Sequence, residues 1–274
     1  MALPPPDPRG TALVTGASSG IGAALARGLA ERGHGVTLVA RREDRLRQVA
    51  DELARAHGVR TEVVAADLAR EDERDRMADA VAARELIVEV LVNCAGFGIY
   101  APLAVSDRRR ELEQVRLLVE AVVDLVARYV PAMVQRGRGA VINLASTAGF
   151  QALPGNVNYS AAKSFVLIHT EGLHEELRGT GVTATAVAPG PVRTEFQATS
   201  EALFANRLPR FVWTDPDRVA RDALHAAERG KRSVVPGGVA HKVAFAPNRL
   251  IPATLTAPVT RRLMAGELDR TRRG

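Results

Sequence analysis

Cysteine is almost absent from this chain. Cys94 is the single cysteine among 274 residues, so an intrachain disulfide cannot form and a small disulfide-stapled fold is excluded. No stretch approaches the ~18 uninterrupted apolar residues that a membrane-spanning helix needs. The sequence MALPPPDPRG at residues 1–10 lacks the basic and apolar regions of a secretory signal. We therefore expect a short disordered tail there, on a protein of the reducing cytoplasm.

Lysine is also scarce, although the chain is basic overall. Lys163, Lys231 and Lys242 stand among 37 basic residues, which face 31 acidic ones and leave a net charge of +6. The arginines alternate with acids, as in RREDRLRQ and REDERDR, and this pattern is typical of solvated helix faces. We expect no nucleic acid partner, and a basic tail that binds nucleic acid or a membrane surface is the alternative. No His, Cys and Asp residues stand at metal-ligand spacing, so no metal site is expected.

Short apolar segments alternate with longer amphipathic ones along the chain. The apolar segments are typical of strands that helices cover on both faces, and they span residues 11–15, 35–40, 61–67, 88–93, 139–145, 182–188 and 232–236. The amphipathic segments predict helices over 20–32, 43–57, 71–84, 108–136, 158–178 and 216–229. The alternation predicts an α/β fold with a doubly wound parallel sheet. We expect one domain over 11–236 and a C-terminal extension, 237–274, that packs partly on it.

A glycine-rich loop, TGASSGIG at residues 15–22, follows the first expected strand and opens a helix. Glycines permit a tight turn and a close approach to a pyrophosphate, and a helix N-terminus favours phosphate charge. Serines are favoured caps for such a helix. An incidental glycine-rich turn is the alternative. The candidate cofactor-binding residues of this loop are Gly16, Ser18, Ser19, Gly20, Ile21 and Gly22.

A tyrosine and a lysine stand four residues apart in YSAAK, where Tyr159 and Lys163 would share a helix face. Chance predicts ~0.03 such pairs from three tyrosines and three lysines. An ammonium near a phenol lowers the phenol pKa from ~10, which makes Tyr159 a candidate general acid and base. Ser146 ends the strand 139–145, at the sheet edge where α/β proteins bind ligands, and could hold a substrate oxygen; a plain turn serine is the alternative.

These motifs occur together in one known family. With TGASSGIG, Asp67 after the third strand, NCAG at 93–96 and PGPVRT at 189–194, the chain resembles the short-chain dehydrogenase/reductase family in its compact, single-domain form. The resemblance implies a Rossmann-type sheet of about seven strands and NAD(P)-linked interconversion of alcohols and carbonyls. The cofactor positions that it implies are Asp67 and Leu68 at the adenine, Asn93, Ala95 and Gly96 along the cleft, Pro189, Gly190, Val192 and Thr194 at the nicotinamide end, and Tyr159 and Lys163 beside the nicotinamide ribose.

The second strand predicts which cofactor is preferred. An NAD site of this type places a carboxylate at the end of that strand for the ribose 2′-hydroxyl. Here the strand is followed by Arg41 and Arg42, and Glu43 comes after both. A guanidinium suits a 2′-phosphate, so NADP is expected over NAD; two solvated arginines are the alternative. In the implied reaction a hydride reaches a carbonyl carbon, Tyr159 protonates the oxygen, and Ser146 orients it.

One position departs from the family pattern. The family usually has an asparagine in the long helix before the serine, feeding a water chain to the lysine; counted back from Pro131, this position is Leu118. The relay then needs another route, and a dinucleotide-binding sensor or scaffold with little turnover is the alternative function. Apolar residues predict an apolar substrate, such as a 3-oxoacyl or ketosteroid-like carbonyl; they are Phe97, Ile99, Tyr100, Phe150, Leu153 and Pro154, with a possible lid at 197–213. The family resemblance also implies a homodimer or homotetramer formed through helices 108–136 and 158–178.

Overall fold

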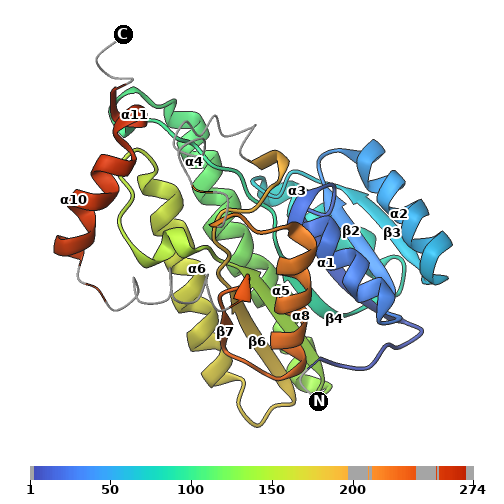
Figure 1. Ribbon diagram of the computed structural model, residues 1–274. Helices are drawn as coiled ribbons and strands as arrows, with labels where there is room; N and C mark the ends of the chain where they lie inside the picture. Colours follow the sequence, from blue (N-terminus) through green and yellow to red (C-terminus); the bar gives the residue numbers. More distant parts are fainter. Residues whose placement is uncertain (1–2, 197–208, 210–211, 239–250, 252, 270–274) are drawn as a thin grey trace.

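The computed structural model describes residues 3–196, 209, 212–238, 251 and 253–269. Its centre is a seven-stranded sheet in the order β3-β2-β1-β4-β5-β6-β7, and every pair of neighbouring strands is parallel (Figure 1). The strands are β1 (Gly10–Thr15), β2 (Val36–Ala40), β3 (Thr61–Ala65), β4 (Ile87–Asn93), β5 (Gly139–Leu144), β6 (Val182–Val187) and β7 (Ser233–Val234). The strand order changes direction at β1, which lies between β2 and β4. Open α/β sheets bind their ligands at such a switch point.

Helices cover both faces of the sheet. One face carries α1 (Gly20–Glu31), α2 (Glu43–His57) and α8 (Pro216–Glu228), and the other carries α3 (Glu71–Ala82), α5 (Ala121–Gln135) and α6 (Val157–Glu176). Successive strand residues feed opposite cores: Val14 packs with the first group of helices and Leu13 with the second. All six residues of β1 are buried, which explains why the strands read as continuous apolar runs.

The sequence-based elements are confirmed. Each of the seven expected strands is present, and its first and last residues lie within two positions of the expected bounds. The long helix expected over 108–136 is present but is not uniform, because α4 (Arg108–Val115) continues into α5 through a π-helical turn, η2 (Arg116–Glu120). Such single π turns inside α-helices frequently occur at functional sites.

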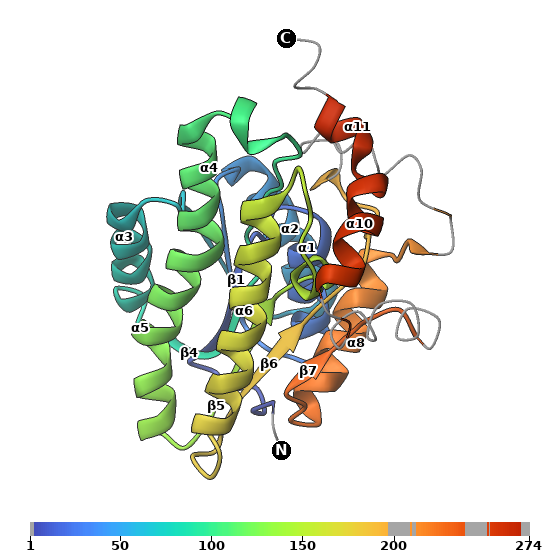
Figure 2. The ribbon, with the colours of Figure 1, turned by 90° about the vertical axis from the view of Figure 1, so that its left-hand side faces the viewer.

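Both ends of the described chain contact the domain. Leu3 is buried, and Arg60 donates to the Pro8 carbonyl at 2.7 Å, so part of the segment that we expected to be a disordered tail contacts the domain. At the other end, α10 (Ala253–Leu263) and α11 (Ala265–Leu268) lie at the top of the molecule beyond α6 (Figure 2). Residues 270–274 of the expected C-terminal extension lie outside the described residues. No helix in the described ranges has both the length and the apolarity to cross a membrane.

Candidate functional site

Three side chains meet beyond the carboxyl end of β5; we call Ser146, Tyr159 and Lys163 the tyrosine cluster. Ser146 precedes the 3-10 turn η3 (Thr147–Phe150) and its hydroxyl oxygen accepts from the Ala148 amide at 3.1 Å. Tyr159 and Lys163 lie one turn apart on α6, and the Tyr159 phenol lies close enough to Ser146 for that side chain to lower its pKa. The side chains of Tyr159 and Lys163 are only 9% and 6% exposed. The spacing therefore brings together the groups that the sequence singled out.

Burial controls the titration of this cluster. It raises the pKa of Tyr159 to about 12, an effect that the Ser146 side chain opposes, and it lowers the pKa of Lys163 to about 8. We expected the lysine to lower the tyrosine pKa. In the structure the Lys163 Nζ atom lies 5.7 Å from the ring centroid and donates to the Leu144 carbonyl at 2.6 Å. Its charge is thus directed at a backbone oxygen, and desolvation of the phenol outweighs it.

A buried polar ladder supports the cluster from beneath the sheet edge. Asn93 and Asn143 are paired residues on β4 and β5, and the Asn93 amide donates to Asn143 Oδ1 at 2.9 Å. Asn143 in turn donates to Thr170 Oγ1 on α6 at 2.9 Å. This ladder ties α6 to the sheet, so the register of the tyrosine cluster on α6 is fixed. Sequence reasoning missed Asn143 and Thr170, because they stand in an apolar strand and mid-helix, with no motif around them.

The glycine-rich loop fits a dinucleotide phosphate. Gly16 and Gly20 have φ of +68° and +56°, which L side chains rarely adopt. A Cβ on Gly22 would collide with the Gly16 carbonyl. Ser19 is the N-cap of α1 and makes no side-chain capping bond, so the first amides of α1 remain available to an anion. These are the properties that a pyrophosphate cradle requires.

Arginines from α2 gather over this loop. Arg42 donates to the hydroxyls of Ser18 and Ser19 at 3.1 and 2.9 Å, and it also pairs with Glu195 at 2.8 Å. Arg45 pairs with the other Glu195 oxygen at 2.9 Å, and the two arginines hold the pKa of Glu195 below its usual value. We call Arg42, Arg45 and Glu195 the arginine cluster. Sequence reasoning missed Arg45 and Glu195, because their pairing joins segments 150 residues apart.

Arg41 behaves differently from its neighbour. Its side chain is exposed, and in the ranges that the structure describes it makes no ion pair or hydrogen bond. Of the two adjacent arginines, only Arg42 is directed at the glycine-rich loop. Arg41 and Arg42 both stay predicted 2′-phosphate residues, and in this structure Arg42 is the one that contacts the glycine-rich loop.

The remaining expected cofactor residues follow the ends of the strands. Leu68, Asn93 and Ala95 line a cavity of about 10 Å³ at the switch point. Asp67 turns its carboxylate back to accept from the Ala69 amide at 3.1 Å. Thr15 at the end of β1 accepts from the amides of Cys94 and Ala95 at 2.9 and 3.1 Å, which fixes the NCAG segment against the glycine-rich loop.

The segment after β6 closes the site on its other side. The Pro189 carbonyl accepts from the Thr147 amide at 3.0 Å, beside Ser146. Val192 forms a bridge with Thr214, which holds the PGPVRT turn, including Gly190, in place. A Cβ on Gly20 would lie 3.0 Å from the Thr194 methyl group. The expected nicotinamide-end residues thus span from the tyrosine cluster to the glycine-rich loop.

Leu118 lies beside the tyrosine cluster. It lies in the π-helical turn η2, it is 1% exposed, and it packs in one apolar cluster with Tyr159. A Cβ placed on Gly96 would lie 2.8 Å from Leu118 Cδ2 and 4.0 Å from Lys163 Nζ. An apolar side chain therefore fills the space next to the lysine.

Apolar side chains gather on the open side of Tyr159. Phe196 packs against the Tyr159 ring with centroids 5.7 Å apart, and it also contacts a cluster of Tyr100 and Met264. Tyr100 was expected here, whereas Phe196 and Met264 were missed because nothing in the sequence ties them to the motifs. Phe150 packs with the α3, α5 and α6 core instead. Most of the possible lid, residues 197–208 and 210–211, lies outside the described residues.

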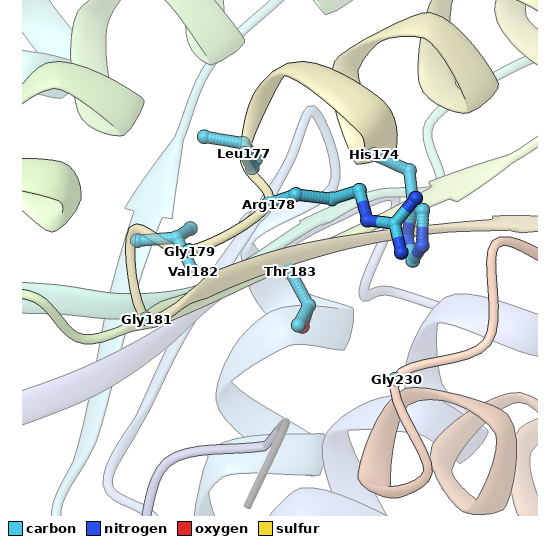
Figure 3. Close-up of a pocket in the computed structure, with 8 residues that line it drawn as sticks. All are labelled: His174, Leu177, Arg178, Gly179, Gly181, Val182, Thr183 and Gly230. Atoms are coloured by element: carbon cyan, nitrogen blue, oxygen red, sulfur yellow. The ribbon is translucent and has the colours of Figure 1, made fainter.

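A separate pocket lies at the opposite edge of the sheet. It has a volume of about 300 Å³ and lies between the end of α6 and the start of β6 (Figure 3). His174 is bonded to the Ala184 carbonyl at 2.8 Å, and Arg178 pairs with Glu175 at 3.0 Å. The guanidinium that lines this pocket, that of Arg178, is therefore already paired. None of the residues that line the pocket belongs to the tyrosine cluster. No group of three or more His, Cys, Asp and Glu residues gathers as for a metal in the part of the chain that the structure describes.

Comparisons with known proteins agree with this geometry. Residues 10–203 match the model of the short chain dehydrogenase family. A very-long-chain 3-oxoacyl-CoA reductase from Anas platyrhynchos is 34% identical over 203 residues, which are 72% of this chain and 64% of that relative's length.

Solved structures agree as well. A short-chain dehydrogenase from Sphingobium yanoikuyae in complex with NADPH is 33% identical with a TM-score of 0.77, and the match covers 90% of this chain and 94% of that one. A bulky-bulky ketone specific alcohol dehydrogenase from Comamonas testosteroni is 30% identical with a TM-score of 0.73, covering 89% and 90%. With its Rossmann-type sheet and its match over most of the chain, this protein belongs to the short-chain dehydrogenase/reductase family of oxidoreductases.

Proposed function

We propose that this protein is an NADP-preferring reductase that interconverts a carbonyl and a secondary alcohol, with Tyr159 as general acid and base. The observation that carries the proposal is the tyrosine cluster, in which the Tyr159 phenol is buried beside Ser146 and above Lys163. The cluster stands at the carboxyl edge of the sheet, beside the glycine-rich loop. A bound nicotinamide dinucleotide supplies or accepts the hydride.

The chain's own residues handle the proton and the oxygen. The Ser146 hydroxyl donates to the substrate oxygen and orients it beside the phenol. In reduction, Tyr159 Oη gives its proton to that oxygen as negative charge develops there; in oxidation it takes the proton back. A phenol with a pKa near 12 is fully protonated at neutral pH, which suits the reducing direction. Lys163 is held at its Leu144 hydrogen bond, below the ring, and stabilises phenolate after the proton has left.

The arginine cluster supports the NADP preference. Arg42 reaches across the glycine-rich loop to Ser18 and Ser19, and no carboxylate from the end of β2 competes for a ribose hydroxyl there. A guanidinium with two serine hydroxyls offers several donors to a 2′-phosphate, whereas a 2′-hydroxyl would use few of them. The solved relative that contains NADPH is consistent with this preference.

The substrate is expected to be an apolar carbonyl of 3-oxoacyl or ketosteroid-like type. Phe196, Tyr100 and Met264 form the side of the site that faces away from the glycine-rich loop. Aromatic and thioether side chains bind hydrocarbon and exclude water from the reacting oxygen. Two relatives point the same way, since one is named for very-long-chain 3-oxoacyl-CoA and the other for bulky ketones.

A dinucleotide-binding protein with little turnover is the second candidate. Leu118 favours it, because the leucine fills the space beside Lys163 where a polar group would hold water. The intact tyrosine cluster weighs against it.

A panel of ketones and 3-oxoacyl thioesters, assayed by NADPH oxidation, separates the two candidates. A reductase gives turnover on at least one apolar carbonyl, and NADPH serves better than NADH. Tight NADPH binding without turnover on any member of the panel, by the wild-type chain, would establish the second candidate instead. The Tyr159→Phe variant is the control for unspecific oxidation.

We also propose a homodimer or homotetramer that associates through α4, α5 and α6. These helices lie on one face of the protein, with α5 and α6 side by side (Figure 2). They expose apolar side chains to solvent, namely Leu112, Val115, Val123, Val134, Val157, Phe165 and Ile168. An exposed apolar face of this extent is typical of an interface. Sedimentation of wild type and of Ile168→Asp, which places a charge at the centre of α6, tests it: a monomeric wild type would contradict the proposal.

A further inference from the structure

Helix α10 has an inner side that attaches it to the domain. Thr256 and Thr260 are buried, as is Met264 just after the helix, and these residues recur every four positions along one side. Thr260 donates to the Ala152 carbonyl at 3.1 Å. Met264 packs with Tyr100 and Phe196. The inner side therefore rests on the segment after η3 and on the apolar end of the site.

The outer side of α10 carries Leu255 and Val259, and Ile251 lies just before the helix; we call these three apolar residues the outer stripe. They too recur every four positions, and Leu255 and Val259 are 67% and 66% exposed, the highest exposures among the large apolar side chains together with Ile168. Figures 1 and 2 show α10 as the outermost layer, with no other helix or strand drawn over it. Isolated exposed apolar residues are ordinary, but a stripe along one helix marks an interaction surface.

Positive charge accompanies the outer stripe. Arg261 and Arg262 are exposed in the last turn of α10, and in the ranges that the structure describes neither forms an ion pair. Residues 237–274 hold seven of the chain's 37 Lys and Arg residues and two of its 31 Asp and Glu residues. The net charge of this segment is thus +5 of the total +6. The rest of the chain is almost neutral.

The charge decides which partner fits the stripe. A second copy of this chain would meet the same patch across a two-fold axis, and Arg261 and Arg262 would then face the same arginines of the other copy. An anionic lipid surface matches both features, since it offers phosphates to the arginines and a hydrocarbon boundary to the apolar side chains. We propose that α10 docks this protein on an anionic membrane surface, with Leu255 and Val259 at the headgroup boundary and Arg261 and Arg262 at lipid phosphates.

Docking through α10 would bring the substrate side of the site to the lipid. Met264 follows α10, and its contacts lead through Phe196 to the Tyr159 ring. An apolar carbonyl partitioned in the bilayer would then have a short path to the site. This consequence rests on the proposed function, whereas the binding of lipid by α10 does not.

Flotation of the full chain with vesicles tests the proposal. Vesicles of phosphatidylcholine alone are compared with vesicles that also contain phosphatidylglycerol, each at low and high salt. We expect binding to the anionic vesicles only, and weaker binding at high salt because the Debye length shrinks from ~10 Å at 0.1 M to ~3 Å at 1 M. Each basic residue near an anionic surface contributes about 1 kcal/mol to binding. We therefore expect the Arg261→Gln/Arg262→Gln variant to bind the anionic vesicles about thirtyfold more weakly. Leu255→Ser/Val259→Ser should weaken it at least tenfold.

The control is Leu103→Ser/Val105→Ser, which removes two apolar residues that are also more than half exposed, but on the turn η1 (Leu103–Val105) and not on α10. It should bind vesicles as wild type does. The substituted side chains are all exposed, so each variant should have the melting temperature of the wild type. No flotation of wild type, equal binding to neutral vesicles, or full binding by either α10 variant overturns the proposal. So does a change of oligomeric state in Leu255→Ser/Val259→Ser without a change in flotation, because the stripe would then join two copies. None of these readouts requires turnover.

Discussion

The tyrosine cluster and the arginine cluster handle charge in opposite ways. Tyr159 and Lys163 are almost wholly buried, and burial shifts both pKa values toward the neutral forms, to about 12 and about 8. In the arginine cluster the side chains of Arg42 and Glu195 are 43% and 44% exposed, and charge is balanced by direct pairing at 2.8 Å. Burial disfavours the charged forms in one cluster, and direct pairing favours them in the other.

This difference predicts different responses to mutation and salt. Electrostatic effects in a dry site are strong and little screened, whereas exposed pairs contribute little to stability and weaken as salt rises. Substitutions in the tyrosine cluster should therefore give large effects at any ionic strength. Substitutions in the arginine cluster should give moderate effects on cofactor choice that depend on salt.

The largest effect is expected for Tyr159→Phe. Removing the phenolic oxygen removes the proton donor and leaves the packing against Phe196 in place. We expect turnover to fall by at least the 10²–10⁴ that general acid catalysis contributes, with the NADPH dissociation constant nearly unchanged, measured by steady-state assay and by fluorescence titration. Turnover retained within a factor of about ten would remove Tyr159 from its role.

Lys163 should make folding stability depend on alkaline pH. Its pKa is about 8 in the folded protein and 10.5 as a model group, so between these values the unfolded chain holds a proton that the folded chain lacks. Stability then rises with pH across this window, by up to about 3 kcal/mol at 1.36 kcal/mol per unit, and is flat below it. Urea unfolding of wild type and Lys163→Met at several pH values measures the difference. A wild type that shows no gain relative to the variant would mean that Lys163 stays protonated when buried.

Arg42→Ala is expected to change cofactor choice. A lost charge-assisted contact is worth about 1.5–3 kcal/mol, so the Michaelis constant for NADPH should rise ~10- to 150-fold while that for NADH barely changes. The wild-type preference should also shrink at high salt. Arg41→Ala is the matched control, since the Arg41 side chain is exposed and makes no hydrogen bond or ion pair in the part of the chain that the structure describes. Equal effects of Arg42→Ala on both cofactors would assign Arg42 to structure.

The smallest effect is expected for Leu118→Asn. The amide would place a polar anchor beside Lys163 and allow water to be held there, at some packing cost. We expect a few-fold higher turnover number, most visible at high pH where proton supply limits reduction, and an unchanged NADPH affinity. Leu118→Met keeps the site apolar and should show no gain. If both variants behave alike, proton resupply does not run past this position.

Local pattern was sufficient for the elements and for much of the site. The central strands β1, β4 and β5 are buried on both faces, so their residues are mostly apolar and stand out against the amphipathic helices. The groups of the tyrosine cluster could be found because Tyr159 and Lys163 are neighbours on one helix and Ser146 directly follows a strand. Glu195 and Phe196 could not be found, because only the folded chain brings them to Arg42 and Tyr159.

The sequence by itself determined the parallel sheet, its seven strands and the glycine-rich turn, since periodicity and backbone freedom are local properties of the chain. Tertiary structure alone decided the protonation of the site. The Tyr159–Lys163 spacing predicts a lowered tyrosine pKa, yet burial raises it and the lysine is held by the Leu144 carbonyl. Tertiary structure likewise gave two adjacent arginines different surroundings. Arg42 donates to Ser18 and Ser19, whereas the side chain of Arg41 is exposed to solvent. Desolvation and side-chain direction depend on which distant segments pack around a group, and no local pattern contains that information.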